Sequence, residues 1–421
     1  MNIGVYAGGE LPHPEDGGAF GFTGTLFEAI LEFRWGEKKI YIFHHQKENP
    51  ISKNRGVKFV SLLTFSCENY SNGCECKKTT GIKKIIASLK KILGTFLGRV
   101  NLQNTQCNKE LLNRACEYYG VGVVWFMAPC FEPVSIPYFI TVWDLEHRKQ
   151  PYFPEVSISG NTFEAREKFY APVLQKAAKI IIGNRVGAHD VNQFYGVSLS
   201  RIACIEFPVP SYCSKISQQI SLDVLLEIPK PYLFYPAQFW PHKNHVVIID
   251  ALKYLQQAGH EFRVVFTGAD KGNLEYITKY VRDQRLEEKV YFLGFVDQQA
   301  IVALYQNAFC LVFASYFGPN NLPPLEAMQL GCPVISALYD GAQEQLGEAA
   351  LYFKPFDSLV LAESIIRLHT ELGLRESLLA KGQALAQARS AESYIRAIDK
   401  LFEEFMQIRK CWSLDQRYKH L

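Results

Sequence analysis

The sequence lacks three features, and each absence excludes a class of protein. It has no unbroken apolar run that could cross a membrane, because its most apolar stretch, 119–143, is interrupted by Pro129, Glu132, Pro133 and Pro137. Its formal net charge is only +3 over 421 residues, which argues against a nucleic-acid partner. Its 11 cysteines include no Cys-x-x-Cys pair, which disfavours a zinc knuckle.

The cysteines and the first residues of the chain indicate in which cellular compartment we expect the protein. The chain begins with residues that predict a strand followed by glycines, not a signal peptide. We therefore expect a cytoplasmic protein with free thiols. A zinc site stays open as a minor alternative at one group of cysteines: Cys67, Cys74, Cys76, Cys107 and Cys116.

The most informative stretch runs from Cys310 to Ser336. Residues 310–314 form an apolar run typical of a buried parallel strand, and 315–321 are rich in turn formers. A helix is predicted to start at Pro323 and Pro324 and to end at Gly331, before a further strand at 334–336. The helix N-terminus then lies at the carboxyl edge of a parallel sheet, where anionic cofactors and phosphates bind.

Glu326 is predicted to stand in the first turn of that helix, where a carboxylate has two interpretations. It can cap the exposed N–H groups of the helix. It can also accept hydrogen bonds from sugar or ribose hydroxyls. The residues alone do not choose between the two.

Residues 322–335, LPPLEAMQLGCPVI, resemble the donor-site signature of retaining glycosyltransferases of family four. The resemblance implies the GT-B fold: two Rossmann-like doubly wound α/β domains that face each other across a cleft. In that family two glutamates flank seven residues; the second, which binds the ribose of the nucleotide sugar, matches Glu326, and the first is Gly318 here. The Gly-Pro-Asn-Asn sequence resembles a subgroup, in which we expect Asn320, Asn321 and Leu322 to line the sugar.

The chain divides into four parts by its pattern of strands, helices and linkers. Strand and helix patterns alternate on both sides of a connector rich in Pro, Ser and Gln. We predict an acceptor domain at 1–206, a linker at 207–230 and a donor domain at 231–390. A helix at 391–421 is expected to cross back towards the first domain, as the resemblance implies.

In the first domain the resemblance assigns two clusters to the cleft. A glycine-rich loop precedes a helix predicted at 25–34, and its Gly17 and Gly18 match the position near the donor diphosphate, although a plain tight turn is the alternative. Trp143, Asp144 and His147 follow a predicted strand, where relatives carry a His-Asp pair and a second His. We expect them to face the acceptor, whereas Asp144 could instead cap the next turn.

In the second domain the loop 235–245 matches the diphosphate-binding loop of the family. Lys243 matches its Lys, while Gln238 replaces its Arg. Residues 294–296, including Phe295 and Val296, match the backbone edge that contacts the nucleobase. Because no Asp-x-Asp occurs in the chain, we expect no metal cofactor, with Lys243 and backbone N–H groups stabilising the leaving group.

Residues 81–100 have apolar residues at helical spacing and lysines elsewhere, with no acidic residue. A basic amphipathic helix of this kind predicts peripheral contact with the inner face of a membrane, and a domain helix with solvated lysines is the alternative.

The sequence thus predicts a metal-independent retaining transferase. A hexosyl unit, with mannose from GDP-mannose the favoured donor sugar, passes to a glycan or lipid-linked glycan. The predicted catalytic residues are Asp144, Lys243 and Glu326. A sugar-nucleotide epimerase or an inverting GT-B enzyme is one alternative, and a degenerate protein that only binds glycans or nucleotides is another.

Overall fold

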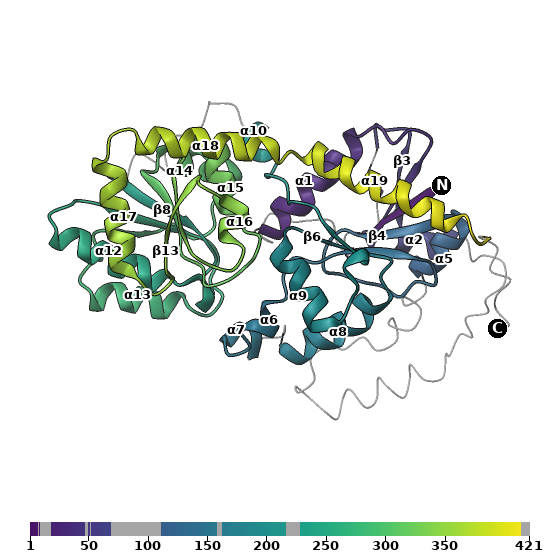
Figure 1. Cartoon of the computed structure of the whole chain (residues 1–421), viewed down its shortest axis with the longest axis horizontal. Coiled ribbons are helices and arrows are strands. Elements are labelled where there is room, and N and C mark those ends of the chain that lie inside the picture. Colours follow the sequence, from purple (N-terminus) through teal and green to yellow (C-terminus); the bar gives the residue numbers. More distant parts are fainter. Residues whose placement is uncertain are drawn as a thin grey trace, which may run out of the picture.

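A computed structural model describes residues 1–6, 8, 18–46, 49–50, 52–68, 111–157, 162–215 and 228–413. The basic segment 81–100, Gly17 and three of the clustered cysteines (Cys74, Cys76 and Cys107) lie outside these ranges. The described residues form two lobes side by side, each with a sheet covered by helices (Figure 1).

The first lobe is built on a seven-stranded parallel sheet in the order β3-β2-β1-β4-β5-β6-β7. The strand order reverses between β1 and β4, which is the switch point at which doubly wound sheets bind ligands. The strands are β1 (Asn2–Tyr6), β2 (Lys39–His44), β3 (Val57–Ser61), β4 (Val121–Phe126), β5 (Tyr138–Thr141), β6 (Lys179–Ile182) and β7 (Ile202–Cys204).

The second lobe repeats this plan with six parallel strands in the order β10-β9-β8-β11-β12-β13. Its switch point lies between β8 and β11, whose following loops carry Lys243 and Gly318. The strands are β8 (Tyr232–Pro236), β9 (Arg263–Thr267), β10 (Val290–Phe292), β11 (Cys310–Phe313), β12 (Val334–Ala337) and β13 (Ala350–Phe353).

Helices cover both sheets. In the first lobe and the connection they are α1 (Gly18–Glu32), α2 (Leu62–Glu68), α5 (Leu111–Tyr118), α6 (Glu146–Lys149), α7 (Pro154–Ser157), α8 (Phe163–Lys176), α9 (Arg185–Tyr195), the 3₁₀ turn η2 (Leu199–Arg201) and α10 (Tyr212–Lys215). In the second lobe they are the 3₁₀ turn η3 (Pro241–Lys243), α12 (His245–Gln257), α13 (Leu274–Asp283), α14 (Gln298–Asn307), α15 (Leu322–Gln329), α16 (Ala342–Leu346), α17 (Ser358–Thr370) and α18 (Leu374–Ala388).

The last helix, α19 (Ala391–Arg409), packs against the first lobe, where the chain begins. It continues from α18 on the second lobe and lies along the first lobe beside α1 (Figure 1). Its Phe402 stacks on Phe139 of β5 with ring centroids 5.2 Å apart. Apolar burial of this kind is the main force that holds a helix to a sheet.

The sequence-based elements agree with the structure except at a few ends. The predicted strand Lys39–His44 and helix His245–Gln257 have the observed bounds. The helix predicted at 25–34 was wrong at its start, because α1 begins at Gly18. Glycines at 18, 21 and 24 were taken as loop residues, but Phe22 and Leu26 of this segment are buried in the first-lobe core.

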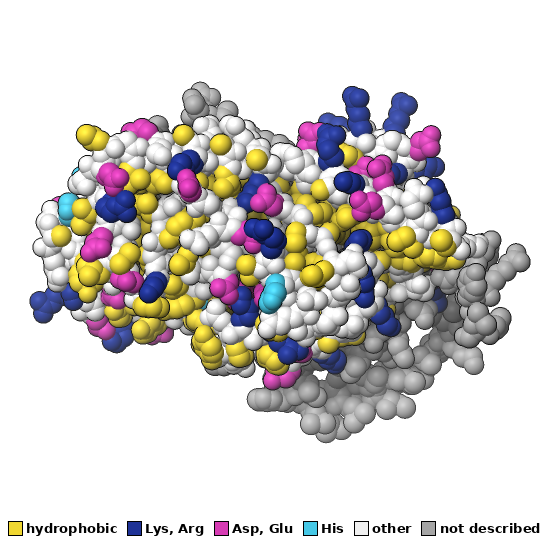
Figure 2. All heavy atoms as spheres, in the orientation of Figure 1, with side chains coloured by type: hydrophobic (Ala, Val, Ile, Leu, Met, Phe, Trp, Pro, Cys, Tyr) yellow, Lys and Arg dark blue, Asp and Glu magenta, His cyan; other side chains and the backbone are white. Residues whose placement is uncertain are grey.

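On the face drawn in Figure 2, Lys and Arg side chains lie among Asp and Glu, without one large basic patch. No helix in the described ranges is long and apolar enough to cross a membrane.

Candidate active site

Lys243 ends a short turn that the second lobe holds rigidly. The hydroxyl of Tyr235 donates to its carbonyl oxygen at 2.9 Å, and Asn244 follows in the left-handed conformation, at φ 55°. The Asn244 amide donates to the carbonyl of Pro355 at 2.6 Å. The backbone at Lys243 is therefore fixed on both sides.

The side chain of Lys243 is a cation with no ion-pair partner among the described residues. Nζ lies 5.5 Å from the centroid of the Phe313 ring and forms no ion pair with any residue that the structure describes. Burial lowers the pKa of Lys243 to about 8, and the opposing charges that act on it are Asp144 and Glu155 of the first lobe. An anionic ligand would restore its ordinary pKa.

The loop after β11 explains why Gly318 cannot be a glutamate here. Gly318 has φ +109°, a conformation that residues with a side chain rarely adopt. A Cβ atom at this position would lie 2.8 Å from Oδ1 of Asn321. Both facts exclude a cleft-facing carboxylate at this point of the loop.

The two asparagines of this loop have different surroundings. Asn321 is buried and clamped: its backbone N–H donates to Oε1 of Gln345 at 3.1 Å, and its amide donates to the Gly318 carbonyl. The side chain of Asn320 instead packs against Gly183 of the first lobe. The contact is so close that a Cβ atom added to Gly183 would lie 2.5 Å from the Asn320 side chain. The Asn320 amide nitrogen is buried without a hydrogen-bond partner among the described residues, which leaves its two N–H groups for a ligand.

Leu322 starts α15 at the junction of the lobes. It is buried in the first-lobe core cluster, and its Cδ1 approaches Gly21 of α1. Its side chain therefore joins the lobes, and the predicted contact of Leu322 with the sugar remains untested.

Glu326 is buried, in the second turn of α15. The hydroxyl of Tyr305 donates to its Oε2 at 2.8 Å, and Tyr212 of α10 is also bonded to it. Burial raises the pKa of Glu326, and the two tyrosine hydroxyls oppose that shift. The carboxylate does not cap the helix, because no acidic residue occupies the first turn of α15. The ribose contact remains a prediction.

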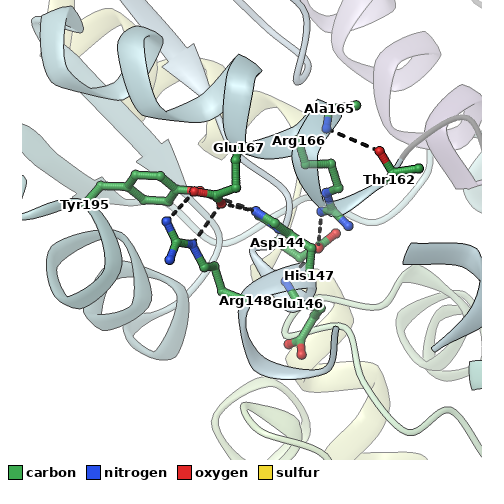
Figure 3. A network of polar contacts seen from close by, with 9 residues as sticks. All are labelled: Asp144, Glu146, His147, Arg148, Thr162, Ala165, Arg166, Glu167 and Tyr195. Atoms are coloured by element: carbon green, nitrogen blue, oxygen red, sulfur yellow. Dashed lines mark hydrogen bonds and ion pairs between the residues drawn. The ribbon is translucent and has the colours of Figure 1, made fainter. Parts of the chain in front are cut away.

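Asp144 is held by Arg166 of α8, whose Nη2 donates to Oδ1 at 2.7 Å (Figure 3). The backbone N–H of Glu146 donates to the same oxygen at 3.1 Å. Burial alone would raise the pKa of Asp144, but the charge and the hydrogen bond of Arg166 keep it below its usual value. Asp144 is therefore an ionised carboxylate and a weak base.

His147 lies behind Asp144 in a network of α6, α8 and α9 (Figure 3). Its ring is completely buried, and Nε2 contacts Oε1 of Glu167 at 2.7 Å. The Tyr195 hydroxyl donates to the same Glu167 oxygen. In this arrangement the His147 ring is covered by protein, and its predicted contact with an acceptor remains untested.

Trp143 points towards α1. Its ring packs edge-on against Phe22, with centroids 6.1 Å apart, and its Nε1 is buried without a hydrogen-bond partner. Gly18, the first residue of α1, precedes Phe22 by one turn.

The nucleotide end of the predicted site lies on the loops after β8, β9 and β10. Phe295 is 56% exposed, and Val296 is partly buried beside it. Oε1 of Gln238 accepts from the indole of Trp240 at 3.1 Å, and Nζ of Lys271 lies 5.8 Å from the centroid of that ring. Lys271 is thus a second cation near the position where the family has Arg.

Several residues of this site have no signal in the sequence. Glu155 contacts His242 across the lobes, Arg166 pairs with Asp144, and Lys271 comes close to Trp240. None of these belongs to a recognisable pattern, because each partner lies on a distant segment. Only their folded arrangement reveals them.

Two hollows lie beside α9, apart from these residues. One, of about 580 Å³, lies between the lobes and is lined by Lys149, Arg185, His189 and Asp340 among others. The second, of about 380 Å³, is lined by first-lobe residues that include Arg185 and His189. Neither is lined by Lys243, Asp144 or Glu326. Among the described residues, no group of three or more His, Cys, Asp or Glu could hold a metal ion.

Residues 222–385 match the family model described as glycosyl transferases group 1. The matched range covers the second lobe as far as α18. Lys243, in the loop after β8, and Glu326, in α15, both fall within the matched range.

The curated relatives are distant. O-antigen chain mannosyltransferase B of Escherichia coli is 26% identical over 185 residues, which are 44% of this chain and 47% of that protein. The chain thus spans about half the length of this relative.

Solved structures establish the fold of the whole chain. Sucrose-phosphate synthase from Thermosynechococcus elongatus aligns with a TM-score of 0.68 at 17% identity, over 97% of this chain and 100% of that one. HepE of Anabaena in complex with UDP-glucose aligns with a TM-score of 0.62 at 14% identity, over 96% and 100%. Together with the two parallel sheets, these matches identify the GT-B fold of glycosyltransferases.

Proposed function

We propose that the protein transfers a hexosyl unit from a nucleoside diphosphate sugar to a glycan hydroxyl, with retention of the anomeric configuration. The observation that carries the proposal is Lys243, a partly buried cation that forms no ion pair with the described residues. It lies at the switch point of the sheet that falls within the family match. Such a cation is costly unless a ligand supplies the negative charge.

Lys243 would stabilise the leaving diphosphate. As the bond between sugar and phosphate breaks, negative charge grows on the phosphate oxygens, and an ammonium held near them lowers the energy of the transition state. Because its backbone is already fixed, little reorganisation is needed at that moment. The unpaired amide of Asn320 and backbone N–H groups would complete the donor site.

No carboxylate on the Gly318 loop can act as a nucleophile on the sugar, and Asp144 is tied to Arg166. This arrangement favours a front-face displacement, in which the leaving phosphate takes the proton of the acceptor hydroxyl. The chain contains no Asp-x-Asp pair, so the proposed chemistry uses no metal ion.

Mannose, as GDP-mannose, is the proposed donor sugar, and the similarity to an O-antigen mannosyltransferase supports it. UDP-glucose is the competing donor, because it is the ligand of the HepE complex.

We propose a glycan or lipid-linked glycan as the acceptor, handled in the cytoplasm, with 81–100 as a membrane contact. We propose that the chain comprises an acceptor domain (1–206), a linker (207–230), a donor domain (231–390) and a helix that returns to the first lobe (391–421).

A second candidate is a protein that binds nucleotide sugars without turnover. Gly318 favours it, because the loop has no carboxylate to face the sugar.

A panel of nucleotide sugars tests the proposal. Purified protein is incubated with GDP-mannose, UDP-glucose and related donors, with and without glycan acceptors, and products are identified by mass spectrometry and by the NMR of the new anomeric proton. We expect transfer that requires an acceptor and gives a retained anomer. Turnover without an acceptor would favour an epimerase, an inverted product would exclude the retaining mechanism, and thermal stabilisation without any product would favour the binding-only protein.

A further inference from the structure

A short segment of the first lobe sits on the turn that carries Lys243. Glu155 of α7 accepts a hydrogen bond from the backbone N–H of His242 at 3.1 Å and a second one from Nδ1 of the same residue. The two side chains are only 13% and 10% exposed. A carboxylate of one lobe thus binds both the main chain and the side chain of the residue before Lys243 in the other lobe.

Aromatic rings shield this contact from water. The His242 ring stacks on Phe317, with centroids 4.1 Å apart and an interplanar angle of 13°. Phe153, two residues before Glu155, packs edge-on against the same Phe317 ring at 5.2 Å. In such surroundings a hydrogen bond to a carboxylate is stronger than in water.

The ring of His242 is neutral, which determines which partner donates the hydrogen bond between His242 and Glu155. Burial and the neighbouring charge of Lys243 lower the pKa of His242 to about 4. A neutral imidazole carries one N–H, and the approach of the Glu155 carboxylate to Nδ1 places that hydrogen there. The ring therefore donates to Glu155 and has a single favoured orientation.

The remaining sides of the turn are held from within the second lobe. The backbone N–H of Tyr316 donates to the His242 carbonyl at 2.9 Å, and Tyr235 holds the carbonyl of Lys243. Glu155 is the contact in this set that comes from the other lobe. It exists only while the lobes touch at this point.

We propose that Glu155 is a positioning residue for the transfer reaction, which fixes the turn of His242 and sets Lys243 on the leaving diphosphate when the lobes meet. The inference rests on the proposed function. A carboxylate so close to a diphosphate also repels it, so Glu155 is expected to contribute little to donor affinity and more to the rate of the chemical step.

Glu155→Ala is the test variant, and Asp340→Asn is its matched control. Asp340 also forms an ion pair between the lobes, with Lys149 at 2.7 Å, but it does not touch the turn of Lys243. With GDP-mannose, or with UDP-glucose if the panel selects it, we expect kcat of E155A to fall about tenfold, on the order of one charged hydrogen bond. The donor Kd, measured by calorimetry, should stay within about threefold, and Glu155→Gln, which can still accept from the main chain, should recover part of the rate.

A double-mutant cycle with Lys243→Ala separates positioning from a general effect on the lobes. If Glu155 acts through Lys243, its removal costs little further rate in the K243A background. Equal losses in both backgrounds, or a loss in D340N as large as in E155A, would overturn the inference.

Amide hydrogen exchange gives a readout that does not depend on turnover. Exchange in peptides that cover residues 239–244 should be faster in E155A than in wild type, and unchanged in D340N. If wild type shows no transfer with any donor, the proposed function fails, and unchanged exchange in E155A then refutes the role of Glu155 separately.

Discussion

The charged residues of the candidate site differ between the two lobes in whether they have an ion-pair partner. In the first lobe Asp144 is paired with Arg166, and Glu167 accepts from His147, Arg148 and Tyr195 (Figure 3). In the second lobe Lys243 has no ion-pair partner among the described residues. A partly buried charge without a partner is retained at a cost in stability, so the comparison supports the proposal that the second lobe binds the charge of the ligand.

The comparison agrees with the range of the family match, which covers 222–385 and so the second lobe. The solved structures match the fold over 95–97% of the chain, at identities of 12–17%, so the first lobe shares the fold while the family model matches only the second lobe. A common donor and varied acceptors would produce this difference. The following predictions test the contrast, from the largest expected effect to the smallest.

Lys243→Ala should lower kcat by about 100-fold, because removing a preorganised charge from the leaving group typically costs about 3 kcal/mol. The matched control is Lys253→Ala, since Lys253 is an exposed lysine of α12 that contacts Gln284. Steady-state kinetics over a range of donor concentrations separate kcat from KM. A K243A enzyme with wild-type kcat would show that the unpaired cation is not part of the reaction.

Arg166→Met should destabilise the fold at neutral pH by about 2 kcal/mol, the order of a lost charged hydrogen bond that leaves Asp144 without its partner. The pKa of Asp144 is lowered in the folded protein, so its stabilisation is present above the ordinary pKa near 4 and is lost as pH falls through the lower folded value. Urea unfolding should therefore show the difference between wild type and variant shrinking as pH falls below about 4.

Asp144→Asn provides the control for this comparison. In the D144N background the Arg166 substitution should have a smaller effect, because the partner charge is already absent. A difference between wild type and R166M that stays the same at every pH would mean that Asp144 is not the group involved.

The sequence predicted the sheets better than the site. Buried strands such as Cys310–Phe313 are short apolar runs between turn residues, and this pattern alone locates them. The start of α1 was missed, since Gly18, Gly21 and Gly24 favour a loop by local propensity while packing of Phe22 and Leu26 decides for a helix. Tertiary contacts override propensity there.

The candidate site likewise has some residues that the sequence indicates and some contacts that only the folded structure shows. Lys243 and Glu326 were predicted as site residues because they lie in local patterns next to strands. Two hydrogen bonds fix the surroundings of these residues: Tyr305 donates to Glu326, and the backbone N–H of His242 donates to Glu155. They join residues that are 21 and 87 positions apart. No local pattern encodes such pairs, and the burial that lowers the pKa of Lys243 is likewise a property of the folded lobes.

Glu326→Ala should reduce turnover by about tenfold, as expected for a lost hydrogen bond to a charged group. Tyr305→Phe is the informative control, because it removes the hydroxyl that Glu326 accepts and keeps the carboxylate. If Glu326 binds the donor, E326A raises the donor KM and Y305F changes it less. Equal effects of the two variants on KM and on the melting temperature would instead assign Glu326 to the structure of α15.

Phe295→Ala is expected to have the smallest effect, at most about a threefold rise in donor KM with kcat unchanged. The resemblance assigns recognition of the base to the backbone of 294–296, and alanine keeps that backbone while it removes a ring that is 56% exposed. The measurement is the donor Kd of F295A and wild type by calorimetry, with GDP and UDP compared. A loss of about tenfold or more would mean that the ring itself stacks on the base, since stacking contributes about 1–3 kcal/mol per base. Base recognition would then depend on a side chain, and the second lobe would hold both ends of the donor by side chains of its own.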